Sequence, residues 1–478
     1  MPSTDSILDD FLKGFGYVPT PCQAKFFEAV SEFAADDGCD ILIVNGYAGT
    51  GKTSAVAAVV GALAARKVKT VLLAPTGRSA KVLSGMCSRP AFTVHKHIYR
   101  QQGVADNGMG RFGLSPNKLG GAWFFVDEAS LLGAGGLSRD DSTAEFGSGN
   151  LLADLITFVR SGDRCRLVLI GDNAQLPPVG LDVSPALYPE WMEMTFGGVR
   201  QVELTTVVRQ ALESGILLNA TSIRERISVM SPDEAVSDLR LDLGREDVAR
   251  IGGEDLIETL TDAYARYGDD GVVVLTRSNK RAIRYNLGIR STVRFREERL
   301  VRGDKLMIVK NCYQFLEEVQ GLDYIANGDT AVLRRISHYE DRYGLHFADA
   351  VLEFPDYGDV EVKAKVCLDT LESESASLTQ EQQQALYLGV SADYSHITRK
   401  KERYEAVRED KYYNALQLKY ADAVTCHKSQ GGQWKCVFID CPFWLGEQTV
   451  DDLKWLYTAL TRAQEKVYLV NFPDRFFR

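Results

Sequence analysis

The sequence predicts an α/β protein with two parallel-sheet domains, and three observations indicate this fold. Short, continuous apolar runs recur along the chain, as they do in the buried strands of parallel sheets. A glycine-rich phosphate-binding pattern directly follows the first of these runs. Alternating β-type segments interrupt a second series of apolar runs. We therefore expect two layered α/β domains, the second of them split by a small β-barrel.

The first domain is expected over residues 1–198. Its first strand is Ile41 to Asn45 (ILIVN), and the Ala- and Val-rich segment Lys52 to Ala65 has the pattern of the following helix. Residues 99–121 are glycine-rich and polar, and they form either a hairpin or a loop inserted in this domain. The further buried strands are expected at Thr70–Ala74 (TVLLA), Trp123–Val126 (WFFV) and Leu167–Ile170 (LVLI).

The second domain is expected to combine residues 199–302 with residues 420–478. Each of its apolar runs lies beside a helical or turn-rich stretch, as in the first domain. A parallel sheet is therefore expected here as well. The runs are Val272–Thr276 (VVVLT), Val437–Asp440 (VFID) and Val467–Val470 (VYLV).

The insertion in the second domain is expected over residues 303–419. Alternating segments between Asp304 and Lys365, with turn signals at Asn327-Gly328 and Tyr357-Gly358, predict the small β-barrel. The segment Thr370 to Lys419 is rich in Glu, Gln, Lys and Tyr, and it predicts a helical arm. The simplest interpretation of this arm is a solvated projection.

Composition favours a globular protein of the cytoplasm. The 478 residues suffice for about three or four folding units, and 45% of them are apolar. The longest small-apolar stretch is too short to cross a bilayer, the first ten residues carry acids, and the nine cysteines lack zinc-type spacing. A net charge of −10 by itself argues against a nucleic-acid partner. A local groove of donors within an acidic shell is nevertheless compatible with that charge.

The segment from Gly46 to Thr53 matches the phosphate-binding pattern G-x-x-x-x-G-K-[ST] between a strand and a helix. Its glycines allow backbone N–H groups to close around phosphate oxygens, and the helix N-terminus adds a favourable dipole. Lys52 is expected to neutralise the β- and γ-phosphates. The expected nucleotide-binding residues of this loop are Gly46, Ala48, Gly49, Thr50, Gly51, Lys52 and Thr53.

Two acidic residues, Asp127 and Glu128, directly follow the apolar run WFFV. They should emerge at the carboxyl edge of a parallel sheet, where ligands bind in such folds. Thr53 and Asp127 are the expected partners of Mg²⁺, and Glu128 is expected to orient and deprotonate the attacking water. An Asp-Glu pair alone is weak evidence, since an exposed pair at a strand end is common.

A nucleotide site alone is also compatible with a kinase, a transporter or a GTPase. The remaining motifs distinguish between these classes of protein. In order they are TPCQAKFF, the phosphate loop, APTGRSAKVL, TVHKHIY, VDEAS, GDNAQLPPVG, VVRQ, VVLTRSN, TCHKSQGGQW and YTALTRAQEK. Over almost its full length the chain therefore resembles superfamily-one helicases of the B branch, the RecD/Dda-like group. The resemblance implies two RecA-like domains that hydrolyse ATP with Mg²⁺ and move along single-stranded DNA. It also implies 5′→3′ movement and unwinding of forked duplex DNA.

The resemblance assigns further roles around the nucleotide. Gln23 is expected to bind the adenine edge, although a helix-capping glutamine is the alternative. Gln175 is expected to contact the γ-phosphate or its water. Arg209 and Arg462 are the expected arginine fingers, which neutralise charge across the domain cleft. Outside these motifs, a lone arginine would more simply form a surface ion pair.

The resemblance also assigns a set of DNA-binding residues. Short hydroxyls, amides and single cations suit contact with a sugar-phosphate backbone without base preference. Each of them has a solvated loop residue as its alternative. The first domain is expected to contribute Pro75, Thr76, Arg78, Thr93, His95 and Lys96. The second domain is expected to contribute Thr276, Asn279, Thr425, His427, Lys428 and Ser429.

Departures from the family pattern favour the compact phage-type Dda helicases. Only a short segment precedes Gln23, so we expect none of the N-terminal domains of RecD subunits or relaxases, and Leu131 to Arg166 lacks a Pif-type signature. Phe112 is the candidate for an aromatic strand-separating pin, with simple packing as the alternative. We expect a monomer that meets replication or recombination proteins. The rival functions are a translocase that strips proteins from DNA, a non-motor protein such as a nucleotide kinase, and a scaffold.

Overall fold

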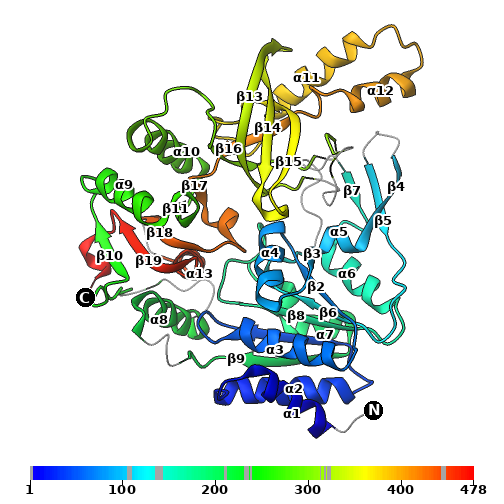
Figure 1. Ribbon diagram of the computed structural model, residues 1–478, viewed down its shortest axis with the longest axis vertical. Coiled ribbons are helices and arrows are strands. Elements are labelled where there is room, and N and C mark those ends of the chain that lie inside the picture. Colours follow the sequence, from blue (N-terminus) through cyan, green and yellow to red (C-terminus); the bar gives the residue numbers. More distant parts are fainter. Residues whose placement is uncertain are drawn as a thin grey trace.

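The computed structural model describes the chain except residues 1–3, 105–109, 135–143, 209–212, 231–235, 237–238, 313, 317–318, 320–324, 443–447 and 478. Two parallel sheets form two α/β domains, and a closed β-barrel with a helical arm lies above them (Figure 1). The predicted fold class is thus confirmed. No helix within the described parts of the chain is long and apolar enough to cross a membrane.

The first domain is a six-stranded parallel sheet in the order β3-β2-β6-β8-β1-β9, with helices on both faces. Both faces are buried, because Leu42 packs in one apolar cluster and Ile43 in another, which explains the continuous apolar run of β1. The strands are β1 (Ile41–Gly46), β2 (Thr70–Ala74), β3 (Ala91–Thr93), β6 (Trp123–Val126), β8 (Arg166–Gly171) and β9 (Val199–Leu204). The helices are α1 (Thr4–Phe15), α2 (Pro21–Ala35), α3 (Lys52–Ala65), α4 (Gly77–Cys87), α5 (Val94–Ile98), α6 (Leu151–Arg160) and α7 (Pro189–Phe196).

Strand β9 corrects the expected boundary of the first domain at residue 198. It pairs with β1 along its whole length, from Ile41 opposite Val199 to Gly46 opposite Leu204. The first sheet therefore extends to Leu204. The sequence pattern missed this strand because its segment, VRQVEL, alternates in polarity as expected for the edge of a sheet.

The second domain contains a parallel sheet in the order β10-β19-β18-β11-β17. Its strands come from both sides of the insertion, as predicted. They are β10 (Val248–Ile251), β11 (Val272–Thr276), β17 (Ala423–Thr425), β18 (Trp434–Asp440) and β19 (Ala463–Val470). The helices are α8 (Gly215–Val229), α9 (Leu256–Tyr267), α10 (Asn279–Gly288) and α13 (Val450–Leu460).

The insertion forms a closed barrel of β12 (Lys305–Ile308), β13 (Thr330–Arg342), β14 (Leu345–Phe354), β15 (Val360–Cys367) and β16 (Leu416–Tyr420). The expected arm is present as α11 (Gln380–Asp393) and α12 (Lys400–Glu409) (Figure 1). The arm does not run on to residue 419, because the chain returns as β16 and closes the barrel against β12. It is also anchored rather than free, since Leu386, Val390 and Val407 are buried against the barrel residue Phe347.

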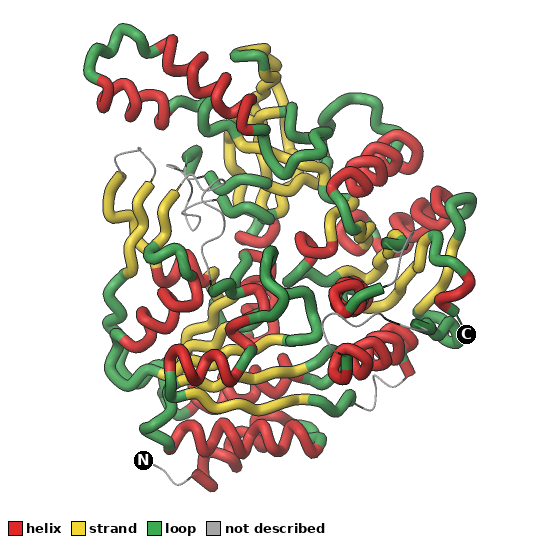
Figure 2. The backbone as a smooth tube through the Cα atoms, turned by 180° about the vertical axis from the view of Figure 1, so that it is seen from behind, coloured by secondary structure: helices red, strands yellow, loops and turns green. Residues whose placement is uncertain are grey.

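The glycine-rich insertion of the first domain is a hairpin rather than a loop. Strands β4 (Tyr99–Val104) and β5 (Gly110–Leu114) pair antiparallel, and β7 (Ala144–Phe146) adds to β5 in parallel. Both views of the backbone put this small sheet on the same side of the molecule as the arm (Figures 1 and 2).

Buried ion pairs join the second domain to the barrel. Arg290 and Arg296 both contact the carboxylate of Asp304, at the entry to the barrel. Arg294 lies 2.8 Å from Asp422, where the chain leaves the barrel. The side chains of Arg294 and Asp422 are 8% and 4% exposed, so their charges depend on one another. Both connections to the barrel are therefore fixed to the second domain.

Candidate nucleotide and nucleic-acid site

The phosphate loop connects the end of β1 to the start of α3. Gly49 and Gly51 have φ angles of +75° and +71°, a left-handed conformation that glycine adopts without strain. The ammonium group of Lys52 donates to the carbonyl of Gly46 at 2.7 Å and to that of Gly171 at 3.4 Å. Lys52 thus lies between the carboxyl ends of β1 and β8, inside the turn of the loop. This is the position from which a lysine neutralises nucleotide phosphates.

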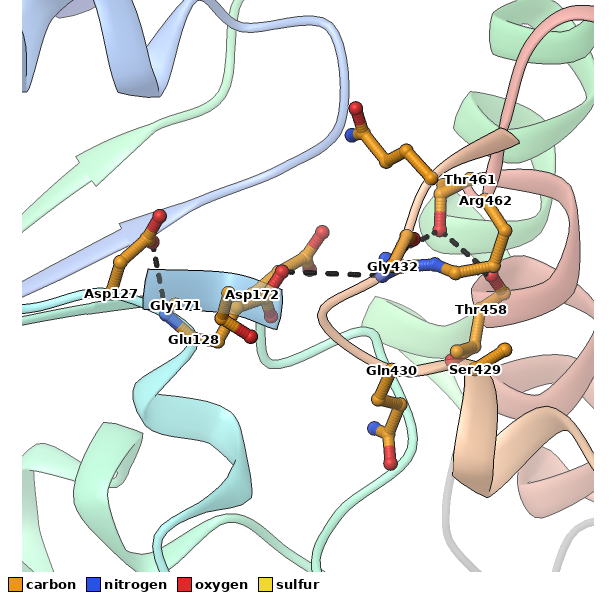
Figure 3. A network of polar contacts seen from close by, with 12 residues as sticks. Asp127, Glu128, Gly171, Asp172, Ser429, Gln430, Gly432, Thr458, Thr461 and Arg462 are labelled. Atoms are coloured by element: carbon orange, nitrogen blue, oxygen red, sulfur yellow. Dashed lines mark hydrogen bonds and ion pairs between the residues drawn. The ribbon is translucent and has the colours of Figure 1, made fainter. Parts of the chain in front are cut away.

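The acidic pair lies at the carboxyl end of β6, as predicted (Figure 3). The backbone N–H of Glu128 donates to Asp127 Oδ1 at 2.9 Å. Burial and the neighbouring charge of Glu128 raise the pKa of Asp127 to about 6, against the opposing effect of Lys52. Glu128 has a φ of +52°, an uncommon conformation for a residue with a side chain, and such conformations gather at functional sites.

Thr53 and Asp127 fit the expected magnesium site in chemistry. Mg²⁺ prefers oxygen ligands, and a hydroxyl on the first turn of α3 together with a carboxylate at a neighbouring strand end provides them. The carboxylate of Asp127 is buried, and its raised pKa shows that its negative charge lacks full compensation. A nearby cation would supply that compensation.

Gln175 lies just after β8, in the segment that begins with Asp172. The residue is 7% exposed, and its Oε1 has no hydrogen-bond partner within the described part of the chain. A buried amide oxygen without a partner costs free energy, so such groups call for a reason. The predicted contact with the γ-phosphate or its water would give this oxygen a partner.

Gln23 makes two contacts with the protein itself. Its Oε1 accepts from the backbone N–H of Thr20 at 2.9 Å, which completes a capping box at the start of α2. Its Nε2 donates to the carbonyl of Thr50 at 3.0 Å. The helix-capping alternative is therefore present, together with a contact to the phosphate loop. Binding of the adenine edge by Gln23 remains a prediction.

Arg462 reaches the first domain from the turn between α13 and β19 (Figure 3). It is 3% exposed, and it donates to the carbonyls of Thr458 and Gly432 at 3.2 and 3.3 Å. Its Nη1 lies 4.0 Å from Glu128 Oε1. The structure thus brings one predicted finger to the acidic pair, while Arg209 lies outside the described residues.

Sequence reasoning missed two residues of α13 that enter the same cleft. The hydroxyl of Tyr457 donates to Asp172 Oδ2 at 2.6 Å and accepts from the backbone N–H of Ala48 at 3.1 Å. The hydroxyl of Thr458 accepts from the backbone N–H of Leu176 at 2.9 Å. Both residues stand in the YTALTRAQEK string, which was the available signal.

Two predicted DNA-binding segments of different domains contact each other. Thr76 caps α4 by accepting from the N–H of Ser79 at 3.2 Å, and the guanidinium of Arg78 lies 4.0 Å from the ring centre of Trp434 in the second domain. A Cβ added to Gly431 would lie 2.1 Å from the hydroxyl of Ser79, so this approach requires glycine. Residues 76–79 therefore meet the loop 431–434 across the cleft.

The other candidates of the first domain lie at the ends of β2 and β3. Pro75 directly follows β2 and is half-buried. Thr93 is buried and caps α5 by accepting from the N–H of Lys96 at 3.3 Å. Burial lowers the pKa of His95, on the same short helix, to about 4. His95 is thus neutral at neutral pH, and a strand would meet it as a hydrogen-bonding group rather than a cation.

Two predicted DNA-binding hydroxyls of the second domain are directed into the protein. Thr276 is fully buried and donates to the carbonyl of Ser278 at 3.0 Å. Ser429 is 1% exposed and donates to the carbonyl of Cys426 at 2.7 Å. The predicted side-chain contacts of these two residues with a strand are therefore not available in this arrangement. Both hydroxyls instead satisfy backbone groups beside the loop.

The remaining second-domain candidates are accessible. His427 and Lys428 are exposed, and Lys428 donates to Asn327 Oδ1 of the barrel at 2.5 Å. Asn279, Thr425 and Lys428 line one pocket between α10 and the barrel. These residues thus face the space between the second domain and the barrel.

Phe112 lies on β5 of the hairpin, opposite Gln101 and Phe146. It is partly buried and packs against the apolar cluster of the first domain. This is the packing role weighed as its alternative, and it gives no support to Phe112 as a strand-separating tip. Residues 105–109, between β4 and β5, lie outside the described residues.

Two family models match the chain. Residues 23–228 match an AAA domain, and residues 420–470 match a UvrD-like helicase C-terminal domain. In these two segments the chain is thus similar to helicases, and the curated relatives include a RecD2 DNA helicase. These two matches carry the motifs of the phosphate loop and of α13, respectively.

The proteins that resemble this chain differ in how much of it they share. An ATP-dependent RecD2 DNA helicase of Deinococcus radiodurans is 28% identical over 231 residues, which cover 47% of this chain and 28% of that protein. An uncharacterised protein of Methanocaldococcus jannaschii is 23% identical over 472 residues, 90% of this chain and 36% of its own length. The chain thus spans about a third of the length of these curated relatives. The Pif1 helicase from Bacteroides, in complex with ADP-AlF3 and single-stranded DNA, has a TM-score of 0.47 and 14% identity, with 97% of this chain and 95% of that one covered.

Proposed function

We propose that this chain hydrolyses ATP to move along single-stranded DNA and to unwind forked duplex DNA. One observation carries the proposal: Lys52 and Glu128 of the first domain and Arg462 of the second domain converge on one cleft. A nucleotide bound there would touch both domains. Hydrolysis would then change how the two domains hold each other, which a single-domain nucleotide site cannot do.

The residues divide the chemistry as follows. Lys52 neutralises phosphate charge, and Glu128 orients the attacking water and takes its proton. Gln175 holds that water through its buried amide oxygen. Arg462, and by resemblance Arg209, stabilises charge that develops in the transition state. Thr53 and Asp127 would hold Mg²⁺, which when bound neutralises charge on the phosphate oxygens.

The DNA track is proposed to run across the loops where the two domains meet, beneath the barrel. Residues 76–79 and the loop 425–434 lie at this place, and they contact each other through Arg78, which lies over Trp434 and donates to the carbonyl of Gln433. Opening of the cleft would break this contact. Alternate tightening of the two segments on a strand would produce net movement. The family resemblance supports 5′→3′ polarity, action as a monomer in the cytoplasm and partners from DNA replication or recombination. A closer kinship with Dda-type helicases also remains a proposal.

Unwinding of forked duplexes tests this function. Wild-type protein with ATP and Mg²⁺ should displace a strand from a fork with a 5′ single-stranded tail, and Lys52→Ala should not. Unwinding from a 3′ tail alone would overturn the polarity. Movement on single strands without strand displacement would favour the protein-stripping translocase. An ATPase rate that is indifferent to single-stranded DNA would support a non-motor phosphotransfer protein instead.

A further inference from the structure

Tyr457 makes a hydrogen-bonded bridge between the two domains. It belongs to α13 of the second domain, yet both partners of its hydroxyl lie in the first domain: Asp172 at 2.6 Å and the N–H of Ala48 at 3.1 Å. The residue is 1% exposed and Asp172 is equally buried. Burial and the charge of Asp172 raise the pKa of Tyr457, so the hydroxyl keeps its proton and acts as the donor.

Both partners of Tyr457 belong to the nucleotide site. Ala48 lies in the phosphate loop, and Asp172 directly follows Gly171, whose carbonyl accepts from Lys52. Burial raises the pKa of Asp172, and the charge of Lys52 opposes this rise without cancelling it. Tyr457 therefore contacts two groups, and the positions of these groups depend on the phosphates that the loop and Lys52 would bind.

Two further hydrogen bonds join the same segment of the first domain to the second domain. The N–H of Leu176 donates to the hydroxyl of Thr458 at 2.9 Å, and Gln430 Nε2 donates to the carbonyl of Leu176 at 2.7 Å. Residues 172–176, which include Gln175, are thus held at both ends by the second domain. Gln430 belongs to the loop that begins at Thr425, so these bonds link the segment of Gln175 to the proposed DNA track.

We propose that Tyr457 is a positioning residue that couples the nucleotide site of the first domain to the DNA-binding loop of the second domain. The inference rests on the proposed function and assigns a role to a residue that acts through Asp172 and Ala48. Opening of the cleft separates Tyr457 from both partners at once. Closure restores both bonds together with the approach of Arg462 to Glu128, because Tyr457 lies in the last turn of α13 and Arg462 in the turn that directly follows this helix.

The Tyr457→Phe variant removes only the hydroxyl and keeps the buried ring. The test measures the Kd of a fluorescent oligothymidine with ADP and with ADP–aluminium fluoride, and takes the ratio of the two values. In wild type this ratio departs from one, because nucleotide and DNA binding are coupled. In Tyr457→Phe the ratio of the two Kd values should change by about tenfold in the direction of one. This is the change expected for loss of a hydrogen bond to a charged group. The kcat of DNA-stimulated ATP hydrolysis should fall by about tenfold with KM for ATP unchanged within about threefold.

Tyr285→Phe is the matched control. Tyr285 donates to Asp440 at 2.8 Å, a similar tyrosine–aspartate pair, but both residues lie within the second domain. It should lower thermal stability while leaving the ratio of Kd values at its wild-type value. A wild-type ratio in Tyr457→Phe would overturn the inference and leave the proposed function intact. If wild-type ATP hydrolysis does not respond to DNA at all, the proposed function fails and the inference fails with it.

Discussion

Removal of the Arg462 side chain should abolish ATP turnover without preventing folding. Its guanidinium already lies 4.0 Å from Glu128, at the edge where phosphates are expected, so no large movement is needed for it to contact the transition state. Loss of an arginine finger costs about 10³- to 10⁵-fold in rate. This corresponds to about 4–7 kcal/mol of activation free energy, at about 1.36 kcal/mol for each tenfold change. We expect Arg462→Ala to fall in this range.

Arg462→Ala should also lower the free energy of unfolding, because it removes hydrogen bonds inside the second domain. Arg462 donates three hydrogen bonds within the second domain, to the carbonyls of Thr458 and Gly432 and to the hydroxyl of Thr461. At about 0.5–1.5 kcal/mol each, their loss should lower the free energy of unfolding by about 1.5–4.5 kcal/mol. The chain should therefore remain folded at room temperature, and turnover can be measured on folded protein.

Arg166→Ala supplies the control for this stability loss. Arg166 also donates three hydrogen bonds to backbone carbonyls, those of Asp36, Cys39 and Ala34, but it lies at the start of β8, at the opposite end of the sheet from the nucleotide site. DNA-stimulated phosphate release is measured for both variants, and urea denaturation gives their stabilities. Arg166→Ala should lose similar stability and keep near wild-type turnover. Equal losses of turnover in the two variants would refute the assignment of Arg462, since destabilisation alone would then explain its effect.

Three further predictions concern the barrel. Burial raises the pKa of Asp329 to about 7, above its unfolded value of about 3.9, so the folded chain binds this proton more tightly. The free energy of unfolding should then fall by up to about 4 kcal/mol as pH rises between these values, and Asp329→Asn should flatten that slope in urea titrations. Gly77→Ala should lower the free energy of unfolding, measured by thermal unfolding, by about 1–3 kcal/mol, because its Cβ would lie 2.4 Å from the hydroxyl of Tyr357. An unchanged stability would contradict this close contact. Arg294→Met should lower the free energy of unfolding by about 3–5 kcal/mol, because it leaves Asp422 buried without its partner. In the double variant Arg294→Met, Asp422→Leu, the free energy of unfolding from denaturant titration should return to within about 1 kcal/mol of wild type.

The elements that carry the nucleotide chemistry could be predicted from local sequence. Gly46 to Thr53 specifies its own conformation, because its glycines permit the left-handed turns and the following apolar residues form α3. The apolar runs of β1, β6 and β8 are equally local signals, since a strand buried on both faces must be apolar at every position. Asp127 and Glu128 could be placed at a sheet edge for the same reason.

Patterns failed where partners lie far apart in the sequence. Strand β9 was missed because its residues alternate, and only pairing with β1 reveals that it belongs to the first sheet. Strand β16 was assigned to the arm, because nothing in LQLKY indicates that it closes a barrel against β12. In both cases the deciding hydrogen bonds join backbone segments, and a backbone hydrogen bond leaves no mark on residue type.

The sequence by itself determined that this chain carries a phosphate-binding pattern and helicase motifs in order. It could not determine which side chains of those motifs face the cleft. Only the tertiary structure decided that Thr276 and Ser429 are directed inwards, and that Tyr457 crosses from the second domain to Asp172. The physical reason is that a motif fixes residue types along the chain, whereas the direction of a side chain depends on the contacts that it makes within its domain and across to the other domain.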